Sequence, residues 1–271
     1  MIKTWLKRLI TVTAAAVLMM ALAGCGGSGG SEEDKSLQKV LSAKQLVLGL
    51  DVNYPPMGYT DENGEIVGFD IDVAQEVCDR LGITLVKQPI DWDAKEEELN
   101  SGRIDCIWNG MSVSPEREEA MCISKPYLRN ELVLVVASGS DIRSKQDIKG
   151  KKIGVQSGST TQEVLEGSEL STENEVLTYD DNIGLMQGLR QGELDVTFID
   201  SVNAYYYISM SDDRFFVLPE SLGDEVFAVG FRKNDKALCE KVQETISEMR
   251  ADGTLKNISA KWFGSDITIV K

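Results

Sequence analysis

The sequence predicts an α/β protein made of two lobes, each built on a parallel sheet. Three observations support this fold class. Strand-like and helix-like segments alternate from residue 46 to residue 262, as in parallel sheets with helical crossovers. The alternation forms two consecutive sets. Each set also contains the motif Leu-x-x-Gly-x-x-Asp, at residues 99–105 and 189–195, where a helix ends and a strand begins.

The first set begins with a β-rich run at residues 46–50. Its clearest helix covers residues 70–81, because Val73, Ala74 and Val77 recur on one face and Gly82 follows the last turn. The other elements expected in this set are strands over 83–87, 104–108 and 132–137, a short helix that Asp93 caps and that runs to Asn100, and a helix that opens at Ser114 and Pro115.

The second set repeats this order, and a tail follows it. The expected elements are strands over 152–155, 176–179 and 196–199, helices that begin near Thr160, cover 182–191 and begin near Ser201, and a tail with a strand over 226–231 and helices over 235–250 and 254–262. In open α/β sheets, ligands bind beyond the carboxyl ends of the strands. Those ends are Asn109 and Gly110 in the first set and Asp200 in the second, so we expect a cleft there.

The N-terminus predicts an export signal. Three basic residues precede an uncharged run over 9–22, which is shorter than the roughly 20 residues that span a bilayer. The run ends in Leu-Ala-Gly-Cys, which resembles the lipobox of bacterial lipoproteins and precedes a Gly/Ser linker. The alternative is an ordinary signal peptide that is cleaved nearby. The predicted segments are a lipoprotein signal peptide over 1–24, a lipidated Cys25 and a flexible lipid-anchored tether over 25–40.

Composition excludes several function classes. The net charge is −16, and removal of residues 1–24, which carry three basic and no acidic side chains, lowers it to −19. Such a chain repels nucleic acid and anionic lipid. The sequence contains no histidine, which excludes His-based triads and the commonest metal ligand. We expect no cofactor and no metal. Export permits disulfides among Cys78, Cys106, Cys122 and Cys239 but leaves their pairing open. Cys78 and Cys106 are expected as buried thiols.

An ordered series of motifs resembles one family. The motifs are Gly-Leu-Asp-Val-Asn-Tyr-Pro-Pro at 49–56, Gly-Glu-Ile-Val-Gly-Phe-Asp-Ile-Asp at 64–72, Gly-Arg-Ile-Asp at 102–105, Asn-Gly-Met-Ser-Val-Ser-Pro-Glu-Arg at 109–117, Ser-Lys-Pro-Tyr at 124–127, Gly-Val-Gln-Ser-Gly-Ser-Thr at 154–160, Gly-Glu-Leu-Asp at 192–195 with Asp200, Asp-Gly-Thr-Leu at 252–255 and Lys-Trp-Phe-Gly at 261–264. Together they resemble the polar amino acid-binding proteins of ABC importers, bacterial extracellular solute-binding protein family 3. The resemblance covers roughly residues 46–264.

The resemblance implies a periplasmic-binding-protein type II, or Venus-flytrap, fold. Two crossover segments, near 128–134 and 222–226, would join a lobe 1 of residues 41–131 and 225–271 to a lobe 2 of residues 132–224. Ligand would close the hinge between them. The implied function is to bind a free amino acid outside the cytoplasm and to deliver it to the permease subunits of an ABC importer. We expect a monomer that performs no catalysis and is held to the cell membrane through its lipid only.

Arg117 is the expected carboxylate ligand. Ser114 as N-cap and Pro115 as the first helical residue place Arg117 in the first helical turn, where the helix dipole disfavours a cation and an anionic partner would offset it. Its guanidinium can hold a carboxylate through two parallel hydrogen bonds. The alternative is a surface ion pair with Glu118 or Glu119. By resemblance, Ser112 also contacts the ligand. Backbone N–H groups at Ser159 and Thr160 can bind the same carboxylate or simply start a helix.

Asp200 is the expected ammonium ligand, because it ends an apolar strand at the cleft; the alternative is an N-cap for the next helix. By resemblance, Tyr54 and Trp92 stack on the ligand. The alternative for Trp92 is ordinary packing. The resemblance also places three more residues at the cleft, which are Asp51, Asn109 and Gly110.

Two other function classes stay open. A dehydratase-like enzyme of the same fold could use paired carboxylates such as Asp51 and Asp200 for acid–base chemistry. A soluble sensor partner could bind the same ligand and pass the signal to a receptor. The sequence does not identify the amino acid, although Asp51 with two aromatic residues favours a polar or basic one.

Overall fold

A computed structural model of the chain describes residues 34–210 and 214–270. The expected signal peptide, Cys25 and the tether as far as residue 33 lie outside the described residues. Within the described ranges, no helix combines the length and the apolar character that a membrane crossing requires.

The expected tether is too long at its C-terminal end. Helix α2 covers Ser36–Ala43, and Val40 is buried against the core of the first lobe. Two hydrogen bonds fix the start of α2 to the beginning of helix α10, which covers Lys236–Asp252. The backbone N–H of Leu238 donates to Ser36 Oγ at 3.1 Å, and that of Ala237 donates to Asp34 Oδ2 at 2.6 Å. Burial of Val40 and these two hydrogen bonds hold residues 34–43 on the first lobe, where the sequence predicted a flexible tether as far as residue 40.

The first lobe is built on a five-stranded sheet with the order β5-β1-β6-β13-β7. Strand β1 runs parallel to β5 and β6, whereas β13 runs antiparallel to β6 and β7. The strands are β1 Gln45–Leu50, β5 Thr84–Pro89, β6 Cys106–Ile107, β7 Met121–Ile123 and β13 Gly230–Arg232; the other elements of this lobe are α3 Phe69–Leu81, α4 Lys95–Asn100, α5 Pro115–Ala120, α11 Thr254–Phe263 and a small sheet of β2 Asn53–Tyr54, β3 Gly58–Thr60 and β4 Ile66–Val67.

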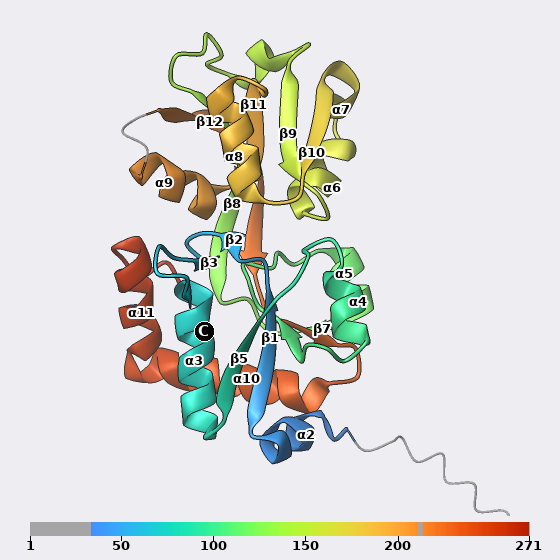
Figure 1. Ribbon diagram of the computed structural model, residues 1–271, viewed down its shortest axis with the longest axis vertical. Coiled ribbons are helices and arrows are strands. Elements are labelled where there is room, and N and C mark those ends of the chain that lie inside the picture. Colours follow the sequence, from blue (N-terminus) through green and yellow to red (C-terminus); the bar gives the residue numbers. More distant parts are fainter. Residues whose placement is uncertain (1–33, 211–213, 271) are drawn as a thin grey trace, which may run out of the picture. The chain divides into compact units, whose positions relative to one another are not determined.

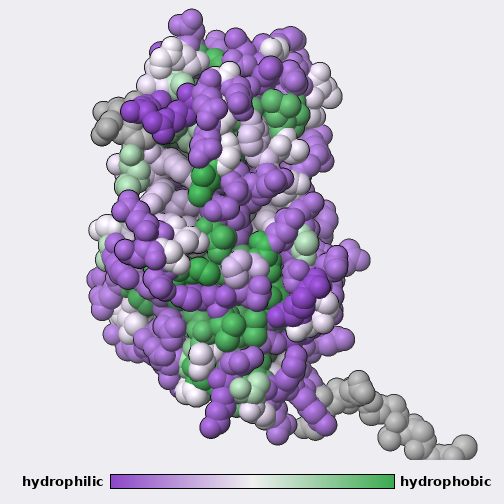
Figure 2. All heavy atoms as spheres, in the orientation of Figure 1, coloured by the Kyte–Doolittle hydropathy of each residue, from purple (hydrophilic) through white to green (hydrophobic). Residues whose placement is uncertain are grey.

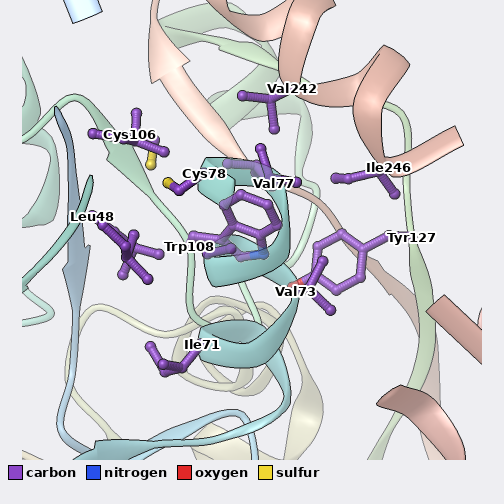
Figure 3. Packing of buried hydrophobic residues seen from close by; sticks show 14 of the residues in the cluster. Leu48, Ile71, Val73, Val77, Cys78, Cys106, Trp108, Tyr127, Val242 and Ile246 are labelled. Carbon is purple, nitrogen blue, oxygen red and sulfur yellow. The ribbon is translucent and has the colours of Figure 1, made fainter. Parts of the chain in front are cut away.

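Helix α3 carries the apolar face that its sequence predicts. Figure 3 shows Val77 and Cys78 pointing from α3 toward Trp108 and Cys106, and all four side chains are buried. Helix α4 begins one residue later than expected, and its N-cap position is Ala94, without a side-chain cap, so Asp93 does not cap it. Among the described residues, Cys78, Cys106, Cys122 and Cys239 are free thiols.

The second lobe has a sheet of the same size with the order β10-β9-β11-β8-β12. Strand β9 is parallel to β10 and β11, and β8 is antiparallel to β11 and β12, so both sheets are mixed rather than wholly parallel. The elements of this lobe are β8 Leu128–Ala137, the 3-10 helix Lys145–Ile148, β9 Lys152–Gln156, α6 Thr160–Glu166, α7 Glu169–Glu173, β10 Glu175–Tyr179, α8 Asn182–Gln191, β11 Val196–Asp200, α9 Ser201–Ser209 and β12 Phe215–Phe227. Separate apolar clusters pack on its two faces.

Strands β8 and β12 connect the two lobes (Figure 1). They pair along their length, from Leu128 opposite Phe227 to Ala137 opposite Phe215, with irregular register near Ser221. The single strand expected over 226–231 is wrong. Strand β12 ends at Phe227 in one sheet, and β13 begins at Gly230 in the other, because the chain changes sheets between them.

Hydrophilic side chains cover most of the face seen in Figure 2. This surface agrees with the net charge of −16 and with the apolar side chains being gathered in the cores of the lobes.

Candidate ligand-binding site

One pocket between the lobes contains every binding residue that the sequence predicts, together with Gln156. Its lining residues are Asp51, Tyr54, Trp92, Asn109, Gly110, Ser112 and Arg117 from the first lobe and Gln156, Ser159, Thr160 and Asp200 from the second. The free space among them is about 20 Å³, which is room for about one water molecule. A free amino acid is larger than this space and does not fit among the side chains as they lie here.

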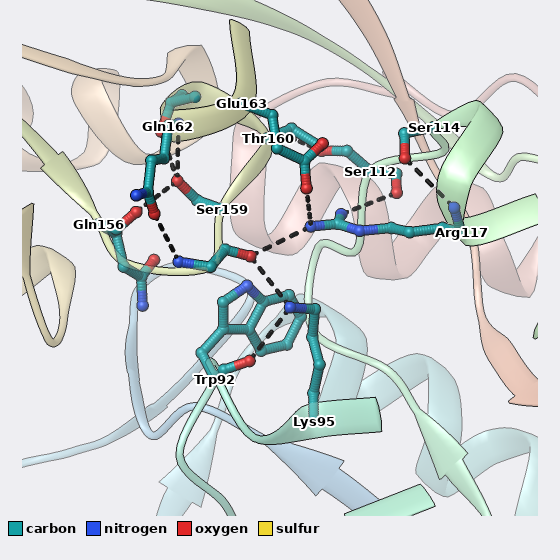
Figure 4. A network of polar contacts seen from close by, with 12 residues as sticks. Trp92, Lys95, Ser112, Ser114, Arg117, Gln156, Ser159, Thr160, Gln162 and Glu163 are labelled. Atoms are coloured by element: carbon teal, nitrogen blue, oxygen red, sulfur yellow. Dashed lines mark hydrogen bonds and ion pairs between the residues drawn. The ribbon is translucent and has the colours of Figure 1, made fainter. Parts of the chain in front are cut away.

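Arg117 forms the positive end of the pocket. Ser114 is the N-cap of α5 and Pro115 its first residue, and the backbone N–H of Arg117 donates to Ser114 Oγ at 3.3 Å, as the sequence predicts. The Arg117 side chain is 4% exposed. Its guanidinium donates to the carbonyl of Ser112 at 3.0 Å and, across the cleft, to the carbonyl of Gly158 at 3.3 Å (Figure 4).

The alternative prediction, in which Arg117 pairs with Glu118 or Glu119 at the surface, is wrong. The carboxylate that approaches its guanidinium is Glu163 of the second lobe, with 3.8 Å between Nη2 and Oε1. Glu163 is 48% exposed, and an ion pair this long to a solvated carboxylate contributes little. The buried guanidinium therefore still favours a closer anion.

Lys95 is a second cation at this end that sequence reasoning missed. Its ammonium donates to the carbonyl of Gly158 at 2.9 Å and lies 5.3 Å from the centre of the Trp92 ring. Burial, and then the charge of Arg117, lower the pKa of Lys95 to about 8. Its position before three glutamates is typical of a solvated helix start, so no local signal distinguished it.

Ser159 and Thr160 face the same end of the pocket. Ser159 is the N-cap of α6, where its Oγ accepts from the N–H of Gln162 at 3.1 Å and donates to the carbonyl of Gln156 at 2.6 Å. The Thr160 hydroxyl donates to Ser112 Oγ at 3.3 Å, across the two lobes. Ser159 therefore caps α6, and both residues also line the pocket.

Asp200 forms the negative end. It occupies the N-cap position of α9 but makes no side-chain cap bond, so the capping alternative is wrong. Its carboxylate accepts from the Tyr54 hydroxyl at 2.5 Å and from the Asn130 side-chain amide. Burial first, and the charge of Glu225 second, raise the pKa of Asp200 well above its ordinary value. This carboxylate is held among neutral donors, which favours a cationic partner.

Glu225 is a further residue that sequence reasoning missed. It lies on β12, and its Oε2 accepts from Ser112 Oγ at 2.7 Å and from Asn130 Nδ2 at 3.3 Å. Only the pairing of β12 with β8 brings it beside the pocket. Its position in the sequence, among charged and apolar residues of a connecting segment, carries no such signal.

Asp51 and Gln156 form a third polar group in the pocket. Gln156 Nε2 donates to Asp51 Oδ2 at 2.8 Å, and Asn182 orients the glutamine by donating to its Oε1 at 2.7 Å. Asn109 Oδ1 accepts from the backbone N–H of Asp51 at 3.1 Å. Burial raises the pKa of Asp51 to about 6. A polar or cationic group placed here would find a carboxylate acceptor.

Gly110 lies where a side chain would not fit. Its φ is +56°, and a Cβ would lie 2.7 Å from the Tyr54 ring. Its backbone N–H donates to Asp70 Oδ2 at 2.6 Å. Trp92 is 8% exposed and packs against Leu99 and Ile104. It also lines the pocket, so it has both of the positions that the sequence left open.

Comparisons with known proteins agree with this architecture. The family model of bacterial extracellular solute-binding proteins, family 3, matches residues 46–265. The chain is 33% identical to the L-cystine-binding protein TcyJ of Escherichia coli over 86% of this chain and 87% of that one. It is also 33% identical to the arginine-binding extracellular protein ArtP of Bacillus subtilis, over 95% and 98% of the two chains.

A solved structure shares the fold closely. It is an ABC uptake transporter substrate-binding protein from Streptococcus pneumoniae with bound histidine, 38% identical, with a TM-score of 0.84 over 88% of this chain and 99% of that one. The two-lobed α/β fold expected from the sequence is thereby confirmed. The family model spans nearly all of the described residues, and the chain belongs to the bacterial extracellular solute-binding proteins, family 3.

Proposed function

We propose that this protein binds a free amino acid between its lobes, with the α-carboxylate on Arg117 and the α-ammonium on Asp200. The observation that carries the assignment is a buried cation and a partly buried carboxylate at separate positions in one pocket. A free amino acid presents both charges, and a desolvated site must satisfy each of them. The protein acts as the amino acid-binding component of an ABC uptake transporter and performs no chemistry on its ligand; its relatives are named as binding proteins.

The carboxylate would replace weaker contacts of Arg117. The guanidinium has five N–H donors, of which two bond to backbone carbonyls. The remaining donors, with Ser112, Ser159 and Thr160 nearby, suit a carboxylate that enters as the lobes separate and close again. At the other end, the three N–H donors of an ammonium suit Asp200 and the aromatic hydroxyl of Tyr54.

The side chain of the ligand would extend toward Asp51 and Gln156. A carboxylate and an amide there favour a polar or basic side chain over an apolar one. Relatives are named for binding L-cystine, arginine and histidine, which are polar amino acids. Trp92 supplies an aromatic face against which such a side chain can stack.

A thermal-shift screen over the common amino acids tests this function. A ligand at 100 times its Kd should stabilise the protein by about 2.7 kcal/mol. The best ligand should be recovered unchanged after release, whereas a converted product would indicate an enzyme. Its decarboxylated and deaminated analogues should each bind far more weakly. A screen in which no amino acid raises the unfolding temperature would refute the proposal.

We also propose that Cys25 carries a lipid that anchors the mature protein to the outer face of the cell membrane, where it meets its permease. The support is the Leu-Ala-Gly-Cys sequence after a basic and apolar start. Cys25→Ser should abolish lipid labelling and release the protein from the membrane fraction. A variant that still sediments with membranes would count against the lipid anchor.

A further inference from the structure

Two acidic side chains meet at the hinge end of the pocket. Asp200 ends β11, and Glu225 lies on β12. A single nitrogen, Asn130 Nδ2, donates both to Asp200 Oδ1 and, at 3.3 Å, to Glu225 Oε2. Because one amide group bonds to both, the two carboxyl groups are direct neighbours.

The other partners of this pair are neutral. The Tyr54 hydroxyl donates to Asp200 Oδ2 at 2.5 Å, and Ser112 Oγ donates to Glu225 Oε2 at 2.7 Å. In the part of the chain that the structure describes, no ion pair joins either carboxylate to a lysine or arginine. The pair therefore has hydrogen-bond donors but no compensating positive charge.

The elements packed against the pair carry other charged groups. Burial first, and then the charges of Asp200, Glu225 and Asp70 of α3, raise the pKa of the Tyr54 hydroxyl. Asp51 of the first lobe lines the same pocket. Arg129 and Glu131, which flank Asn130 on β8, are exposed. Arg117 is engaged with the carbonyls of Ser112 and Gly158.

Asp200 and Glu225 are neighbouring, partly buried carboxylates without a cation, so desolvation and the charge of Glu225 favour a proton on Asp200. Burial and the charge of Glu225 raise the pKa of Asp200 accordingly. A proton held by Asp200 leaves one negative charge on the two carboxyl groups. A ligand ammonium would supply the positive charge that makes this proton unnecessary.

We propose that Glu225 is a second carboxylate for the ligand's ammonium, and that the ammonium displaces a proton held by Asp200. The carboxyl O–H bond breaks, the proton passes to solvent, and the ammonium N–H groups donate to the two carboxylates. This inference rests on the proposed function. Amino acid binding is therefore coupled to the release of one proton.

Titration calorimetry at about pH 7 tests the coupling. Binding is measured in several buffers of different ionisation enthalpy, and the slope of the binding enthalpy against that quantity counts the protons. We expect about one proton released by the wild type. Glu225→Gln should release less than about half as many. Asp224→Asn is the matched control, since it removes the same charge from the adjacent, exposed position of β12, and should release as many protons as the wild type.

Two further measurements isolate the ammonium. Affinity for the amino acid should fall as the pH is lowered from about 9 to about 6, by up to about tenfold per unit where Asp200 is protonated. The deaminated analogue of the same ligand should show no proton release, even if it binds weakly, and this arm requires no variant.

The outcomes separate the two hypotheses. Wild-type protein that binds an amino acid with an enthalpy independent of buffer overturns the proton coupling and leaves the proposed function intact. Full proton release by Glu225→Gln overturns the role of Glu225. Failure of every amino acid to bind overturns the proposed function itself.

Discussion

Replacing Arg117 by alanine removes the cation at one end of the pocket and should greatly weaken amino acid binding. The Arg117 side chain is 4% exposed, so a ligand carboxylate beside it is out of water. Leaving such a charge without its partner costs about 2–5 kcal/mol. This corresponds to an increase in Kd of about 30- to 5,000-fold.

Arg117→Lys should also bind the amino acid much more weakly than the wild type. Lysine restores the charge, but a point charge on a flexible stem cannot bond to both carboxylate oxygens and also reach the carbonyls of Ser112 and Gly158. We expect Kd to stay at least about tenfold above that of the wild type. The control is Arg103→Ala, since Arg103 is 55% exposed and pairs with Glu98 on the outside of the first lobe; its Kd should be unchanged.

Calorimetry with the amino acid and its decarboxylated amine completes a double cycle. The amine should bind the wild type weakly and should lose little more in Arg117→Ala, because the group that Arg117 holds is already gone. If folded Arg117→Ala binds the amino acid within a few-fold of the wild type, the assignment of the carboxylate to Arg117 is refuted.

Three other predictions concern lobe closure, the titration of Asp51 and the role of Trp92. Gly158→Ala places a Cβ 2.7 Å from the Asp93 carboxylate of the opposite lobe, at a φ of +65°. The overpacking should cost about 1–3 kcal/mol and weaken binding about 5- to 150-fold. Small-angle scattering should show that the variant closes less than the wild type when ligand is added, and equal compaction of the two proteins would contradict this prediction. Asp51 has a pKa raised from 3.8 to about 6, so its contribution to stability is present below about pH 4 and is lost as the pH rises through about 6, by at most about 3 kcal/mol. Unfolding midpoints of Asp51→Asn should lack this decline, and a parallel decline in both proteins would rule it out. Trp92 lines the pocket, so its fluorescence should change on binding and Trp92→Ala should lose the change and bind more weakly; native affinity would leave Trp92 a packing residue.

Local interactions allowed much of the secondary structure to be predicted. Helix α8 has the predicted bounds because its signals are local: Asp181 precedes it, Gly192 follows it, and apolar residues recur along its ten residues. The cap of α5 was equally predictable, since Ser114, Pro115 and Arg117 lie within four consecutive positions. The motifs further indicated which residues share the pocket, and the structure brings all ten of them together.

Tertiary structure decided what each pocket residue contacts. Asp200 follows a strand and precedes a helix, a pattern that equally suits an N-cap, and only the approach of Tyr54 and Asn130 gives its carboxylate other donors. Lys95 and Glu225 enter the site through lobe packing and strand pairing. Residues near one another in sequence determined where helices and strands begin and end, because caps and periodicity act over a few positions. The partners of the Asp200 carboxylate come from segments 70 to 146 residues away, so only the folded chain could determine them.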